Sequence, residues 1–97
     1  MRFSWDPRKS EANLTKRGFD FGFASLIFEG PTLERLDDRR DYGERRVLAI
    51  GVAQGVHLTV AYTDRHTPDQ EIERRIISVR RSNRRERKAY REAVAKG

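Results

Sequence analysis

Three runs in the second half of the chain have the composition of β-strands. Residues 45–53 (RRVLAIGVA) are nearly continuous in apolar residues, and residues 56–63 (VHLTVAYT) alternate between apolar and polar side chains. The dipeptide Gln54-Gly55 between them is typical of a hairpin turn. A third run, residues 72–80 (IERRIISVR), follows a polar loop that contains Pro68. These runs predict an antiparallel meander late in the chain.

Successive side chains of the predicted strands point to opposite faces of the sheet, so residues two apart share a face. In residues 56–63, alternation places Val56, Leu58, Val60 and Tyr62 on one face. In the third run, a period of two places Arg75, Ile77, Val79 and Arg81 on one face, and Arg74, Ile76, Ser78 and Arg80 on the other. Two arginines of interest, Arg75 and Arg80, therefore share a face only if a bulge intervenes.

The N-terminal third predicts helices after a short strand at residues 2–5. Asp6 is a suitable N-cap and Pro7 a suitable first residue for a helix over residues 7–17. Basic residues occupy its last turn and Gly18 follows, which is typical of a glycine-terminated helix. The apolar residues that come next have a spacing close to four.

That spacing predicts a second helix, capped by Asp20, running to about Glu29 and stopped by Gly30-Pro31. A weak strand is expected near Leu33 to Leu36, and a loop through Asp41-Tyr42-Gly43. A final helix is predicted over residues 84–96, capped by Ser82 or Asn83.

This order of elements predicts one α+β domain over residues 1–97. Two N-terminal helices would pack on a mostly antiparallel sheet of about four to five strands, with a C-terminal helix after it. The chain has no cysteine, which excludes disulfides and thiolate chemistry. It also has no apolar stretch of signal-peptide or membrane-span length, so we expect a cytoplasmic protein without a membrane partner.

The net charge of +6 is concentrated at the C-terminal end. Residues 74–97 contain ten Lys or Arg and two acidic residues, a local balance of +8, whereas residues 1–73 carry eleven and thirteen, a balance of −2. Most of these cations are arginines, whose planar guanidinium suits bidentate contacts with phosphate. A cluster of this kind indicates an anionic partner, since like charges otherwise repel one another.

Five short motifs occur in order along nearly the whole chain: W-D-P-x-K from Trp5, N-x-x-K-x-G from Asn13, E-R at Glu44, R-I-I-S-x-R from Arg75 and E-R-x-x-Y from Glu86. In this set the chain resembles the BrnT toxins of type II toxin–antitoxin systems. The resemblance implies a RelE/ParE-like fold and an endoribonuclease that arrests translation by cutting RNA. It also implies neutralisation by a BrnA-like antitoxin, whose ribbon-helix-helix dimer binds operator DNA. Arg17 stands where the family commonly has histidine, so any proton transfer by that histidine is absent here.

RNA cleavage without a metal needs a base, an acid and cations that stabilise the phosphorane. As catalytic residues the sequence suggests Arg80 and Arg75 on the phosphate, Glu44 as a base, and Tyr90 as a proton donor or stacking group. Each has a structural alternative: a solvated or antitoxin-binding arginine, a salt bridge for Glu44, and packing against Val94 for Tyr90.

For RNA binding we select Lys16, Arg17, Arg65, Arg81, Arg84, Arg85 and Arg87. The alternative for Lys16 and Arg17 is that they complement a helix dipole. His57 and His66 are separated and have no partner at motif spacing, so no cofactor or metal site is predicted.

The sequence therefore predicts a metal-independent ribonuclease toxin. One rival function is a non-catalytic basic module that binds RNA or DNA through phosphate contacts alone. Another is an antitoxin-binding partner with weakened activity, because the family histidine is missing. The motifs leave open whether the RNA is bound to the ribosome.

Overall fold

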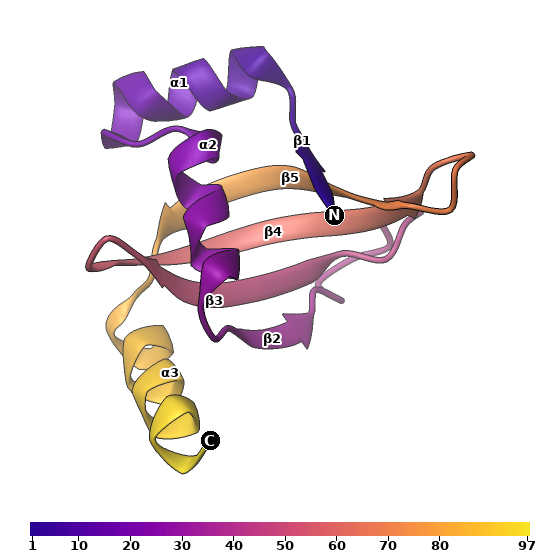
Figure 1. Cartoon of the computed structure of the whole chain (residues 1–97). Helices are drawn as coiled ribbons and strands as arrows, with labels where there is room; N and C mark the ends of the chain where they lie inside the picture. Colours follow the sequence, from indigo (N-terminus) through magenta and orange to yellow (C-terminus); the bar gives the residue numbers. More distant parts are fainter.

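A five-stranded sheet is the centre of the computed structural model, which describes residues 1–97 (Figure 1). Its strands are β1 (Arg2–Ser4), β2 (Leu33–Leu36), β3 (Val47–Ala53), β4 (Val56–His66) and β5 (Ile72–Arg81). The helices are α1 (Pro7–Arg17), α2 (Phe21–Ala24), the 3-10 helix η1 (Ser25–Glu29) and α3 (Arg84–Lys96). The strand order is β1-β5-β4-β3-β2, with β1 parallel to β5 and the other pairs antiparallel. The α+β class is confirmed.

The ends of α1 are set by the residues that the sequence indicates. The Asp6 side chain accepts a hydrogen bond from the Arg8 backbone N–H at 2.9 Å. Gly18 has a φ of 88°, a left-handed conformation that glycine adopts without steric cost, and its N–H donates to the Leu14 carbonyl. These caps satisfy backbone groups that the helix leaves unpaired.

The α-helical part of the second predicted helix is shorter than expected. Asp20 caps it as predicted, accepting from the Phe23 N–H at 2.8 Å, but α2 ends at Ala24 and continues as η1. The predicted helical span, ending at Glu29 before Gly30, is confirmed, but its last five residues are 3-10 rather than α-helical. Ser25 Oγ donates to the Gly22 carbonyl at 2.7 Å, and such local side-chain bonds compete with regular helical hydrogen bonding.

The main core lies between one face of the sheet and the layer formed by α2 and η1, which cross that face in Figure 1. It contains Phe19, Phe21, Ala24 and Ile27 from the helical layer, and Ala49, Ala53, Leu58, Val60, Tyr62, Ile76 and Val79 from the sheet. The predicted inward face of β4 is confirmed for Leu58, Val60 and Tyr62, while Val56 packs at the margin.

The pairing of β4 with β5 is irregular at Ile77. Ala61 pairs with Ser78, but Tyr62 pairs with Ile76, so one extra residue is inserted into β5. The strict alternation predicted for this strand is therefore wrong beyond Ile76, and Ile76 and Val79 both enter the core. Thr63 pairs with Arg75 and Thr59 with Arg80, and these threonines lie four residues apart along one strand, so Arg75 and Arg80 share the opposite face.

Helix α3 lies on the β3 side of the sheet, whereas α1 lies beside β5 (Figure 1). Its start is held by a capping box, in which the Asn83 side chain accepts from the Glu86 N–H and Glu86 accepts from the Asn83 N–H. Of the two caps proposed from sequence, Asn83 is the one used. No helix combines the length and apolar character that crossing a membrane requires.

Gly51 lets η1 approach the sheet closely. A Cβ added at Gly51 would lie 2.8 Å from the Cβ of Ile27 and 3.3 Å from the Cγ2 of Thr32. Ile27 is fully buried, so neither side has room to move.

We expect Gly51→Ala to lower the free energy of unfolding by about 1–3 kcal/mol, because the methyl group overpacks this contact. Urea denaturation of purified protein measures the change. Gly22→Ala is the matched control, since its added Cβ meets only ordinary contacts beginning at 3.5 Å from Asp20 Oδ1. Equal stability of both variants would show that the approach of η1 to β3 is not limited by Gly51.

Candidate functional site

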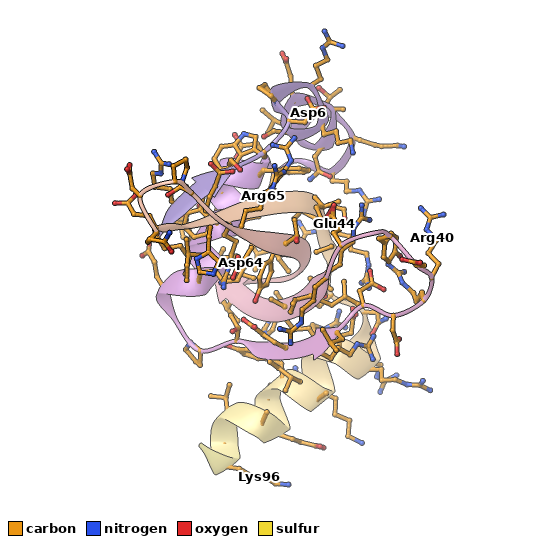
Figure 2. The ribbon with its side chains drawn as sticks, turned by 90° about the vertical axis from the view of Figure 1, so that its right-hand side faces the viewer. Asp6, Arg40, Glu44, Asp64, Arg65 and Lys96 are labelled. Carbon is orange, nitrogen blue, oxygen red and sulfur yellow. The ribbon has the colours of Figure 1, made fainter.

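A small hollow of about 110 Å³ lies between the first turn of α1, the segment before β3, and strands β4 and β5. We call it the basic hollow, and its lining residues are Asp6, Lys9, Glu44, Arg46, Arg65, Arg75, Ile76 and Ile77. Figure 2 shows Asp6 above Arg65 and Glu44, with Lys96 at the opposite end of the molecule. Three residues selected from sequence, Glu44, Arg65 and Arg75, are brought together here.

Arg65 and Arg75 project from the same face of neighbouring strands. Arg75 pairs with Thr63 of β4 and Arg65 lies two residues beyond Thr63, so they are diagonal neighbours about 7–8 Å apart. Arg75 is also flanked by Ser4 of β1, which fixes its backbone on both sides. Neither guanidinium forms an ion pair within the chain. Their mutual repulsion favours binding of an anion between them.

Glu44 reaches the basic hollow because its loop is tied to the sheet. The Asp37 N–H donates to the Arg46 carbonyl at 2.9 Å, and Thr63 Oγ1 donates to the Arg45 carbonyl at 2.8 Å. The Glu44 carboxylate lies 3.6 Å from Arg46 Nε, and its side chain is 41% exposed. The salt-bridge alternative for Glu44 is thus present as a loose contact, which leaves carboxylate oxygens free to accept a proton or hydrogen bond.

Arg46 presents an unused donor to the same region. Its guanidinium stacks 4.0 Å from the centre of the Tyr42 ring, a cation–π contact. Its Nε is buried and has no hydrogen-bond partner. A buried donor of this kind is uncommon, and here the Glu44 carboxylate lies 3.6 Å away, beyond hydrogen-bond distance.

Two residues of the basic hollow, Asp6 and Lys9, were not selected from sequence. Both belong to the W-D-P-x-K motif, so that motif is the signal that could have found them. Asp6 has a structural task as the cap of α1. Lys9 is exposed and forms no ion pair, so it adds a third free cation to the rim.

Arg80 lies elsewhere on the same face and is already paired. Its two terminal nitrogens donate to the Glu86 carboxylate at 2.7 and 2.9 Å. Thr59 Oγ1 and the Asn83 N–H donate to the same carboxylate, at 3.1 and 2.9 Å. The Arg80 guanidinium, followed by the Asn83 and Thr59 donors, lowers the pKa of Glu86 to about 2 against the opposing effect of burial. This network attaches α3 to the sheet.

Tyr90 belongs to the same attachment. Its hydroxyl donates to the Pro31 carbonyl at 2.9 Å, and its ring meets the His57 ring edge-on with centroids 5.8 Å apart. Tyr90 is buried and does not line the basic hollow. These contacts agree with a packing role for Tyr90, although the partners are Pro31 and His57 and the sequence suggested Val94.

The remaining selected cations are dispersed. Arg81 lies 5.8 Å from the Phe19 ring centre, Arg87 donates to the Ser82 carbonyl at 2.7 Å, and Arg84 and Arg85 are exposed on α3. Lys16 and Arg17 line a separate groove beside α1. Of the arginines selected on the last strand and helix, only Arg75 lines the basic hollow, so the structure does not bring Arg75 and Arg80 together there.

The fold and the basic hollow define a small basic α+β protein in which cations from three parts of the chain gather at one hollow. A family model described as "Ribonuclease toxin, BrnT, of type II toxin-antitoxin system" matches residues 5–86, and the chain belongs to this family. Membership implies an RNA substrate and an antitoxin partner. The matched range includes every residue of the basic hollow and ends within the first turn of α3. No curated protein matches the chain.

We expect Glu86→Gln to lower the free energy of unfolding by about 2–3 kcal/mol, because it leaves the half-buried Arg80 without its counter-charge. Glu92→Gln, an exposed change on the same helix, should stay within about 0.5 kcal/mol. Thermal or urea unfolding of the three proteins measures the difference.

The Arg80–Glu86 pair should also make the free energy of unfolding depend on pH. The folded pKa of Glu86 is depressed, so its stabilising effect is full above the ordinary value of 4.5 and is lost as the pH falls toward 2. The stability of the native protein should therefore approach that of Glu86→Gln across this window. Parallel stability curves from pH 6 to pH 2 would contradict the assigned role of the Arg80–Glu86 pair.

Proposed function

We propose that this protein is a metal-independent endoribonuclease toxin with a RelE-like fold, and that the basic hollow is its reaction site. The supporting observation is that Arg65, Arg75 and Lys9, none in an ion pair, surround one hollow together with the Glu44 carboxylate. The family's printed description as ribonuclease toxins supports an RNA substrate.

The residues of the basic hollow have complementary tasks in this proposal. Glu44 accepts the proton of a ribose 2′-hydroxyl, whose oxygen then attacks the adjacent phosphorus. Arg75 and Arg65 hold the phosphate and stabilise the charge that builds up on its oxygens. Lys9 donates a proton to the leaving 5′-oxygen. The products are a 2′,3′-cyclic phosphate and a free 5′-hydroxyl, and atoms and charge balance without water or a metal.

In the same proposal Arg80 and Tyr90 are positioning residues. Arg80 is held by Glu86 and Tyr90 by Pro31, so both act by fixing α3 against the sheet. A guanidinium already bound bidentately to a carboxylate is a weaker ligand for phosphate than a free one. We therefore place transition-state stabilisation on Arg75 in preference to Arg80.

The exposed cations of α3 lie outside the basic hollow and suit a different task. We infer that they face an acidic segment of a BrnA-like ribbon-helix-helix antitoxin, which neutralises the toxin and carries operator DNA through its own dimer. The support is the antitoxin partner implied by the family, together with the excess of cations on α3.

Purified protein freed of antitoxin should cleave RNA in the presence of EDTA, and added antitoxin should stop cleavage. We expect Arg75→Ala to lower kcat/KM about 10²- to 10³-fold, since it removes a donor to the transition state. Glu44→Gln should lower it about 10²-fold or more, because the amide is no base. Gel analysis of labelled RNA fragments measures both.

Arg91→Ala, an exposed change on α3, is the matched control and should cleave as the native protein does. Intact RNA after incubation with native protein, combined with salt-dependent binding, would instead identify the non-catalytic binding module. Full activity of Arg75→Ala would place the reaction outside the basic hollow.

A further inference from the structure

A second concavity lies beside α1, next to the basic hollow. This groove, which we call the helix groove, has a volume of about 340 Å³ and is lined by Lys9, Ala12, Asn13, Lys16, Arg17, Phe21, Ile77, Ser78 and Val79. It shares Lys9 and Ile77 with the basic hollow. The two concavities are therefore neighbours, with these two residues between them.

The cations of the helix groove follow one line. Lys9 and Lys16 are seven residues apart, just under two helical turns, so they project from the same side of α1, with Arg17 beside Lys16. All three are exposed and none forms an ion pair. None of the nine residues that line the helix groove is acidic. Compensation of the helix dipole explains why cations occur at the end of α1. It does not explain why the groove has no acidic residue.

The opposite wall of the helix groove is an open strand edge. Strand β1 pairs with β5 only from Glu73 to Arg75, so β5 has no strand partner on this side from Ile77 onward. Ser78 is exposed in this wall and offers a hydroxyl. Polar groups on one wall and cations on the other suit a sugar-phosphate backbone.

We propose that the helix groove is a binding track for single-stranded RNA that flanks the phosphate held in the basic hollow, an inference that rests on the proposed function. From Lys9 to Arg17 the track measures about 12 Å along the helix axis, which an extended strand covers with about two nucleotides. Lys9 lies at the reacting phosphate, where the track begins, and Lys16 and Arg17 hold the following one or two phosphates. Duplex RNA is contacted across successive minor grooves, a span that this track does not reach.

Binding is measured with non-cleavable 2′-O-methyl RNA oligonucleotides of two, four and six nucleotides, by fluorescence anisotropy over a range of salt. The native protein should bind the longer oligonucleotides more tightly. The variant Lys16→Ala/Arg17→Ala should lose this gain, and its salt slope for the hexamer should fall by about 1.4, from about 0.7 for each single-strand phosphate contact. Lys88→Ala/Arg91→Ala removes two exposed cations of α3 and should retain the gain with length.

The two proposals fail in different ways. A native protein that binds with length dependence but leaves ordinary RNA intact overturns the proposed reaction and leaves the track standing. A Lys16→Ala/Arg17→Ala variant with native length dependence and salt slope overturns the track, even where RNA is cleaved. Tighter binding of duplex than of single strands would likewise overturn it. Circular dichroism and the unfolding midpoint of the variant establish that it is folded. Loss of binding can then be attributed to the two missing cations.

Discussion

The pairing of β4 with β5 is the constraint on which the arrangement of charges depends. The extra residue at Ile77 turns the later half of β5, so that Ile76 and Val79 both enter the core. The same shift places Arg75 and Arg80 on the opposite face. A regular strand would send one of the two arginines toward α2 and η1, where burial without a partner is costly. The bulge thus lets the core close and keeps both arginines on the other face of the sheet.

Arg80 and Arg75 differ in the charged residues that surround them. Arg80 faces α3, where Glu86 neutralises it within a network that also binds the helix to the sheet. Arg75 faces the segment before β3 and the start of α1, where its neighbours are Arg65, Lys9 and the loosely held Glu44. In our proposal, anion binding belongs to the end of β5 where Arg75 forms no ion pair, whereas the end where Arg80 is paired with Glu86 attaches α3.

Local patterns predicted much of this fold. The caps at Asp6 and Gly18 and the inward face of β4 follow from rules that act within a few residues, and they are confirmed. The bulge at Ile77 and the early end of α2 depend on contacts between distant segments, so spacing alone missed them. The same holds for the site. Charge density drew attention to α3, whereas the basic hollow is assembled by the loop that carries Glu44 and by the motif that carries Lys9.

The central claim is that phosphate binds at Arg65 and Arg75 rather than at Arg80. Arginine side-chain Nε–H resonances, assigned in ¹⁵N-labelled protein and followed during titration with a 2′-O-methyl RNA hexamer, test it most directly. The account predicts saturable shifts for Arg65 and Arg75, with the Arg80 resonance unchanged because Glu86 already occupies its donors. Saturable shifts at Arg80, with Arg65 and Arg75 unmoved, would contradict it.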